Sequence, residues 1–359
     1  MNALFPAIRL AGFVTKPWRE KRRCRAVPDI RRIWVHKPDH LGDYLLARAA
    51  LTMLQTAWPS ATLTVACHPA AQPLVELDGR MAFAWASPFL GGHGSILAYR
   101  KEVLAFAPDL LVNLRHDWRD MLLCTTLGAP RVVSYDHRGA SSLATHIGAP
   151  PDEQRYETDN HTALLRETLD LPLAAAPPMP LTAALTATAQ QAWENVTGNG
   201  PRIALHAAAR TPAKTWPAAH WRELIVLLRD RLDARLLLLG GAADREFNRS
   251  LIVGHDFMLD AAGKFSLAES AALIAQADLL VGVDSGPAHL ASAVGTPLVT
   301  IMSGTNVAAR WTADPSHALV QPVSCAPCRR ERCPEPGHPC LSGLRPGNVW
   351  ETIERVLPR

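Results

Sequence analysis

The sequence lacks the patterns that mark several common classes of protein. No uninterrupted apolar run approaches the ~18 residues that a membrane-spanning helix needs. It has no G-x-x-x-x-G-K-[ST] phosphate loop, no G-x-G-x-x-G after the first expected strand and no H-E-x-x-H. It also contains no Asp-x-Asp pair. The sequence therefore does not indicate ATP hydrolysis on a phosphate loop, dinucleotide-dependent oxidation, zinc proteolysis or a cation clamped to a nucleotide by paired aspartates.

Charge is distributed unevenly along the 359 residues, whose formal net charge is +4. Residues 1–36 carry nine lysines and arginines against two acidic residues, so the basic character lies at the N-terminal end. The near-neutral remainder argues against a surface for nucleic acid. The basic segment, residues 1–29, fits either a contact with an anionic membrane surface or a solvated tail. Its basic cluster follows its apolar run, which is not the order of a secretory signal peptide.

Four of the seven cysteines lie within 16 residues, at Cys325, Cys328, Cys333 and Cys340. Without a secretory signal we expect a reducing cytoplasmic compartment, where such a cluster suggests metal rather than disulfides. Four thiolates can close a tetrahedral site, so we expect a structural zinc or iron ion there. The spacing C-x2-C-x4-C-x6-C departs from common zinc ribbons, so cysteines without a metal remain the alternative.

Two series of alternating strands and helices organise the chain. The first has expected strands at 30–36, 62–67, 81–86, 110–114 and 131–134, and the second at 202–206, 235–239, 279–283 and 297–302. Alternation of this kind predicts parallel sheets covered by helices on both faces. We expect an N-terminal domain at 30–180, a linker at 181–200, a C-terminal domain at 201–345 and a final helix at 346–359. Two such domains would face each other across a cleft.

The loop after the first strand, Lys37–Asp43, is unusually polar for a turn. Gly42 lets the backbone approach a ligand closely. Asp43 opens a helix, where a carboxylate either caps free N–H groups or acts as a general base at the mouth of the cleft. Lys37 and His40 lie in the same segment. Together with Gly42 they are candidates to bind the substrate whose proton Asp43 would take.

A second polar turn follows the strand at 279–283 and includes Asp284, Ser285, Gly286 and His289. Pro287 suits the first position of a helix, and the free N–H groups there can hold a phosphate. Asp284 could accept hydrogen bonds from sugar hydroxyls. The alternative is an ordinary helix cap with His289 packed beneath it.

Two further turns carry residues that could bind a nucleotide and its phosphates. Arg210 and Lys214 follow the strand at 202–206, and a lysine there can stabilise a diphosphate leaving group. The alternative is two solvated cations. Gly241 and Glu246 lie in a strand-to-helix turn where a carboxylate can bind ribose hydroxyls.

In their order along the chain, these motifs resemble glycosyltransferase family 9, the ADP-heptose:lipopolysaccharide heptosyltransferases. The resemblance rests on Lys37…Leu41-Gly42-Asp43, Leu205-His206-Ala207…Lys214…Trp216-Pro217, Asp284-Ser285-Gly286-Pro287-Ala288-His289, Gly295-Thr296-Pro297 and the cysteine segment, which is similar to one in the second-heptose branch. It covers about residues 30–357 and implies a GT-B fold, an α/β architecture of two Rossmann-like, doubly wound domains.

The resemblance also implies an activity: inverting, metal-independent transfer of heptose from an ADP-sugar donor to a lipopolysaccharide inner-core acceptor. Asp43 would be the general base, with the acceptor on the N-terminal domain and the donor on the C-terminal one. The enzyme would need no cofactor for catalysis and would work at the cytoplasmic face of the inner membrane, as a peripheral protein.

Two alternatives keep the fold. One is a heptosyltransferase that modifies serine hydroxyls of a secreted adhesin. The other is a non-catalytic protein that binds nucleotide-sugar. Ala208 and Ala209, which stand where family members often carry Ser or Thr, support the second alternative.

Overall fold

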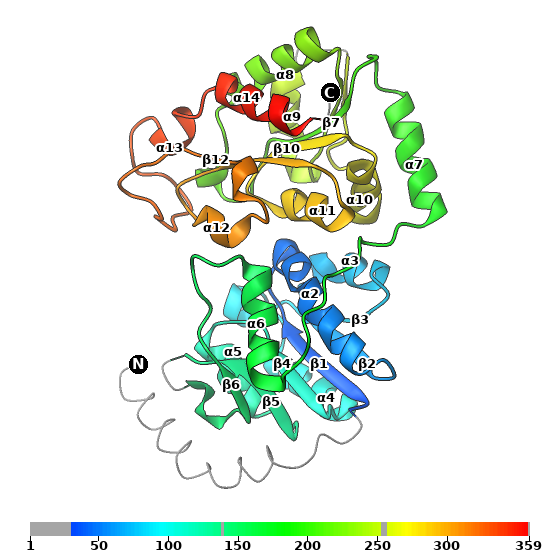
Figure 1. Cartoon of the computed structure of the whole chain (residues 1–359), viewed down its shortest axis with the longest axis vertical. Helices are drawn as coiled ribbons and strands as arrows, with labels where there is room; N and C mark the ends of the chain where they lie inside the picture. The colour runs from blue at the N-terminus through cyan, green and yellow to red at the C-terminus, as the bar shows by residue number, and fades with distance from the viewer. Residues whose placement is uncertain (1–29, 138–139, 253–256, 358–359) are drawn as a thin grey trace. The chain divides into compact units, whose positions relative to one another are not determined.

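The computed structural model describes residues 30–137, 140–252 and 257–357, and it divides the chain into two compact units, at residues 1–177 and 178–359. Each unit holds one parallel sheet of six strands with helices on both faces (Figure 1). Residues 1–29, with the expected contact to a membrane surface, lie outside the described part of the chain. No helix of the described residues is long and apolar enough to cross a membrane.

The first unit contains the sheet β3-β2-β1-β4-β5-β6. Its strands are β1 (Arg32–Lys37), β2 (Thr62–Cys67), β3 (Met81–Ala84), β4 (Leu110–Asn113), β5 (Arg131–Tyr135) and β6 (His146–Gly148). Its helices are α2 (Leu41–Ala57), α3 (Gln72–Leu77), α4 (Ile96–Phe106), α5 (Trp118–Thr125) and α6 (Glu157–Leu169). Chain order reverses between β1 and β4, which is the point where open α/β sheets bind ligands, beyond the carboxyl ends of their strands.

The second unit contains the sheet β9-β8-β7-β10-β11-β12 and so repeats the strand order of the first. Its strands are β7 (Arg202–His206), β8 (Arg235–Leu238), β9 (Met258–Asp260), β10 (Leu279–Val283), β11 (Leu298–Met302) and β12 (Ala318–Val320). Its longer helices are α7 (Ala183–Glu194), α8 (Ala218–Leu232), α9 (Arg245–Ile252), α10 (Leu267–Ala275), α11 (Gly286–Val294) and α14 (Pro346–Val356). The four-residue helices α12 (Ala308–Trp311) and α13 (Pro339–Ser342) complete it. The corresponding reversal lies between β7 and β10.

The central strands are apolar on both faces because helices cover both sides of each sheet. All five residues of β10 are buried, as are all four of β4. In the first unit, Trp85 stacks on Tyr99 with ring centroids 4.2 Å apart. In the second, Trp216 and Trp221 meet edge to face at 5.1 Å. The expectation of two doubly wound α/β domains is confirmed.

The segment expected as a linker, residues 181–200, is largely helical. It contains α7, whose Trp193 indole donates a hydrogen bond to the Leu273 carbonyl of α10 at 3.0 Å. The final helix α14 also belongs to the second unit, since Val349 and Ile353 lie in its apolar core. Buried apolar side chains therefore tie both helices to the C-terminal sheet.

Candidate functional site

The connection from β1 to α2 brings the predicted Lys37 and Asp43 together with a third charged residue, Asp39. The Lys37 ammonium lies 3.1 Å from Asp39 Oδ2 and 3.8 Å from Asp43 Oδ1. The Lys37 side chain is only 4% exposed, whereas Asp43 keeps 23% of its surface exposed. A buried cation thus lies beside two carboxylates, one of which faces solvent.

Asp43 lies in the first turn of α2, and His40 is the N-cap residue of this helix. The His40 side chain makes no capping hydrogen bond and instead contacts His68, with ring centroids 5.0 Å apart. Burial raises the pKa of Asp43 to about 6, and the negative charges of Asp39 and Glu157 act in the same direction, against the Lys37 ammonium. A carboxyl group with this pKa is ionised at neutral pH and still basic enough to take a proton.

The prediction from sequence missed the groups that support this loop from elsewhere in the unit. Arg115 follows β4 and binds Asp39, with Nε 3.0 Å from Oδ1. Glu157 comes from α6 and acts electrostatically on Asp43. The run Asn113-Leu114-Arg115-His116-Asp117 at a strand's carboxyl end was a signal that could have identified Arg115. Glu157 had no such signal, because only tertiary packing brings it close.

In the second unit, three turns meet around Asp284, which directly follows β10. The Lys214 ammonium lies 2.7 Å from Asp284 Oδ2. Asn306, which the prediction missed, donates to the same oxygen at 2.7 Å. Asn306 comes from the turn after β11, so polar residues at neighbouring strand ends converge as the topology requires.

Ser285 and His289 lie at the start of α11. The Ser285 hydroxyl lies 2.9 Å from His206 Nδ1 and makes no capping hydrogen bond to α11. Burial lowers the pKa of His206 to about 4, so this imidazole is neutral near pH 7. Burial also lowers the pKa of His289, although the nearby Asp284 charge opposes that effect. The N-terminus of α11 therefore lies beside the Lys214–Asp284 pair, an arrangement suited to a phosphate.

The remaining predicted donor residues are placed less centrally. Arg210 is exposed in the loop after β7. The Gly241 N–H donates to Asp244 Oδ2 at 2.7 Å, so Asp244 stabilises that turn. Glu246 is exposed on α9 and forms no hydrogen bond or ion pair within the described ranges. Lys214, Asp284, Ser285 and His289 thus form one cluster. The turn at 241–246 is linked to this cluster through Asp244, whose negative charge raises the pKa of His206, the partner of Ser285.

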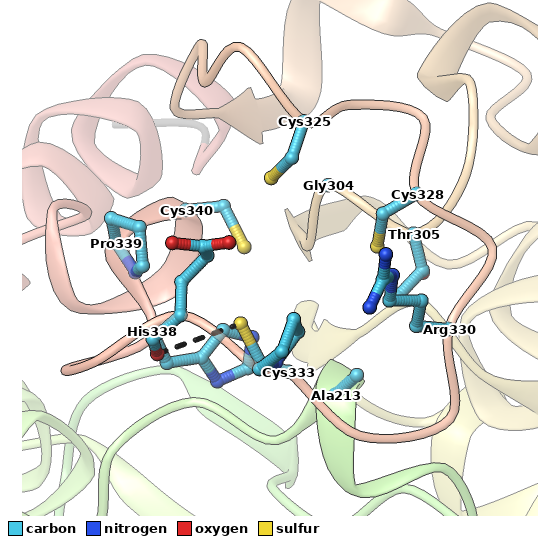
Figure 2. A pocket seen from close by; sticks show the side chains of 12 residues that line it. Ala213, Gly304, Thr305, Cys325, Cys328, Arg330, Cys333, His338, Pro339 and Cys340 are labelled. Carbon is cyan, nitrogen blue, oxygen red and sulfur yellow. Dashed lines mark hydrogen bonds between the residues drawn. The ribbon is translucent and has the colours of Figure 1, made fainter.

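The four clustered cysteines line one cavity of about 260 Å³ in the second unit (Figure 2). Cys325 is exposed and Cys340 is buried. Burial raises the pKa of Cys340 first of all, and the other three thiols act on it in the same direction. Across the described residues, however, no group of three or more His, Cys, Asp or Glu side chains is gathered closely enough to hold a metal ion. The expected zinc or iron at this cluster therefore has no support in the structure, because the thiols line the walls of a cavity instead of converging on one point.

Comparisons with known proteins agree on one family. The family model described as glycosyltransferase family 9 (heptosyltransferase) matches residues 96–338. Lipopolysaccharide heptosyltransferase 1 of Salmonella typhimurium is 37% identical over 105 residues, which are 29% of this chain and 32% of that protein. Lipopolysaccharide heptosyltransferase 3 of Escherichia coli K12 is 24% identical over 295 residues, 74% of this chain and 80% of that protein. The match to the first relative thus spans about a third of its length.

The fold is shared with a solved structure. The Escherichia coli ADP-heptose lipopolysaccharide heptosyltransferase II structure has a TM-score of 0.70 and 21% identity, over 91% of this chain and 98% of that chain. At this identity the likeness shows the fold, which is the two-domain architecture that the motifs predicted.

Proposed function

The chain belongs to glycosyltransferase family 9, the heptosyltransferases, and we propose that it transfers heptose from an ADP-heptose donor to an acceptor in the lipopolysaccharide inner core. The family match over residues 96–338 is the observation that carries this proposal. The names of the relatives supply the substrate class, since those proteins are lipopolysaccharide heptosyltransferases.

Asp43 is the proposed general base. In the transfer, an acceptor hydroxyl oxygen forms a bond to the anomeric carbon while the bond from that carbon to the ADP oxygen breaks. The hydroxyl proton passes to the Asp43 carboxylate, and attack opposite the leaving group inverts the anomeric centre. A pKa of about 6 supports this role, because the carboxylate is ionised near neutral pH and is a stronger base than an ordinary aspartate.

The donor diphosphate is proposed to bind at the start of α11. Lys214 and the backbone N–H groups around Ser285–Ala288 would meet the negative charge that develops on ADP as it leaves. In the proposed mechanism these groups stabilise the ADP leaving group, so no divalent cation is needed. Ala208 and Ala209 supply no hydroxyls, and the partly buried Ser285 and His206 pair offers a hydroxyl and an imidazole at the start of α11. Arg210, Gly241 and Glu246 remain proposed contacts for the rest of the nucleotide.

The proposed setting is the cytoplasmic face of the inner membrane, where a peripheral enzyme can reach a lipid-anchored acceptor. Lys37, His40 and Gly42 are the proposed acceptor-side residues. Lys37 ends β1, and His40 and Gly42 lie at the start of α2 beside Asp43, so an acceptor bound there would have its hydroxyl near the base.

The test is release of ADP from ADP-heptose by the purified protein, with and without lipopolysaccharide truncated in the inner core. We expect release that depends on the lipopolysaccharide, and mass spectrometry should find one added heptose. Transfer only to a serine-rich adhesin would favour a protein acceptor. Tight ADP binding without transfer to either acceptor would contradict the proposed enzyme activity.

A further inference from the structure

A chain of hydrogen bonds and ion pairs runs through the first unit to the segment that carries Asp43. It begins at His36 of β1, whose Nε2 lies 2.8 Å from Asp120 Oδ1. Both side chains are fully buried. The other oxygen of Asp120 binds Arg115 Nη1 at 2.5 Å, and Arg115 Nε in turn binds Asp39 Oδ1 at 3.0 Å. The Arg115 guanidinium therefore binds Asp39 on one side and the buried Asp120 carboxylate on the other.

Asp39 uses its second oxygen to hold Lys37. The Lys37 ammonium lies 3.1 Å from Asp39 Oδ2 but 3.8 Å from Asp43 Oδ1. Both contacts are ion pairs, and the one with Asp39 is the closer. The Lys37 ammonium thus lies between two carboxylates and is closer to Asp39. Asp39 is also the less exposed of the two, at 14% against 23% for Asp43.

The two carboxyl groups have opposite electrostatic environments. Burial opposes ionisation of Asp39, but the Lys37 and Arg115 cations outweigh it and hold the pKa of Asp39 below its usual range. Asp43 faces Lys37 from β1, Asp39 from its own loop, Glu157 from α6 and, more weakly, Arg115. Two neighbouring carboxyl groups with different proton affinities are the usual sign that one is structural and the other handles a proton.

We propose that Asp39 is a positioning residue for the transfer reaction, because it holds the Lys37 ammonium in the closer of two ion pairs and so prevents it from forming a tight ion pair with Asp43. Arg115 and Asp120 keep Asp39 in that orientation. The inference rests on the proposed role of Asp43 as the base. Without Asp39, the ammonium would close on Asp43, which would then be a weaker base that also had to break an ion pair before taking a proton.

The test compares kcat/KM against pH for Asp39→Asn and Lys37→Met with the parent enzyme. In Asp39→Asn, loss of a negative charge and closure of Lys37 on Asp43 both favour the ionised base. We expect the acid limb to move to lower pH by about 1 pH unit and the plateau to fall. In Lys37→Met the acid limb should move to higher pH, since the base loses its nearest cation. Glu102→Gln, which removes a carboxylate from the exposed face of α4, is the matched control and should leave the profile unchanged.

Opposite movements of the two acid limbs would support the inference. A lower plateau in Asp39→Asn with an unmoved acid limb would overturn it, because loss of a merely structural contact lowers activity without changing the titration of the base. If Asp39→Asn fails to fold by thermal unfolding, Lys37→Met decides alone, and an acid limb that stays in place overturns the inference. If Asp43→Asn retains turnover, the proposed base is wrong and the inference falls with it. If Asp43→Asn loses turnover but the acid limbs of Asp39→Asn and Lys37→Met do not move, only the inference is overturned.

Discussion

The Lys214 ammonium and the Asp284 carboxylate form an ion pair with an N–O distance of 2.7 Å. Asp284 is 5% exposed and Lys214 21%, so the pair lies at the edge of the buried sheet with the lysine toward solvent. Asn306 donates to the same carboxylate oxygen and fixes it from the other side. The lysine is therefore held in place before any diphosphate arrives, which is the arrangement that electrostatic stabilisation of a leaving group requires.

Replacement of Lys214 by Met should remove that stabilisation. We expect kcat/KM to fall by about 10²–10³-fold, with weaker ADP binding, because no other described side chain in this cluster offers a cation to the phosphates. Steady-state kinetics and calorimetry with ADP measure the two effects. Lys101→Met, a change of the same kind at an exposed position of α4, is the control. Unchanged kinetics in Lys214→Met would contradict the proposed donor site.

Replacement of Asp43 by Asn should remove the base and keep the shape of the side chain. Turnover should fall by about 10²–10⁴-fold, the usual contribution of a general base. Binding of ADP should stay the same, because Lys214, Ser285 and the other donor residues belong to the second unit. Turnover assays and ADP titration separate the two. A variant that loses ADP binding and turnover equally would point to misfolding instead of lost base catalysis.

The parent enzyme should lose activity on acidification in a window set by Asp43. Its pKa is about 6, and the base works only when ionised, so activity rises as the pH increases through about 6 and levels off above it. A profile of kcat/KM between pH 4.5 and 8.5 at constant ionic strength measures this. An acid limb near pH 4 would mean that an ordinary, solvated carboxylate is responsible.

His206 should make the second unit sensitive to acid. Its pKa is about 4 in the folded state against 6.5 for the free side chain, so between these values the unfolded chain binds a proton that the folded chain does not. The free energy of unfolding should therefore fall as the pH drops from about 6.5 to 4, by about 2–3 kcal/mol at the lower end. Urea unfolding of His206→Asn should show a flatter dependence. The partly exposed His317, changed to Asn, serves as the control and should keep the parent's slope.

The thiols should differ in reactivity. Cys325 is exposed and should react quickly with an aromatic disulfide reagent. Cys67 and Cys124 are buried, and burial raises the pKa of Cys67 to about 12 and that of Cys124 well above its ordinary value. These two should react only after unfolding. A chelator should leave the native rates unchanged, since no metal-binding group is found among residues 30–137, 140–252 and 257–357. Faster reaction with chelator would instead indicate a metal on the cluster.

The sequence by itself indicated nine of the twelve strands that the described residues form, their alternation with helices and the polar turns between them, but it did not predict the short strands β6, β9 and β12. Buried parallel strands must be apolar on both faces, and the turns at their carboxyl ends must be polar, so runs such as Leu279–Val283 followed by Asp284 are visible without coordinates. The same local pattern placed Asp43 at the start of a helix and Lys214 in a loop. The ordered motifs were enough to identify the family.

Only the tertiary structure decided the surroundings of those residues. Glu157 and Arg115 reach the Asp43 loop from separate elements, and Asn306 reaches Asp284 from the turn after β11. The cysteine spacing suggested a closed metal site, but the backbone carries the four thiols around a cavity. The pattern of apolar and polar residues reflects which parts of a segment are buried, so it can be read from that segment alone. The pKa of a side chain and its partners depend on charges that distant segments bring within a few ångströms, so they require the tertiary structure.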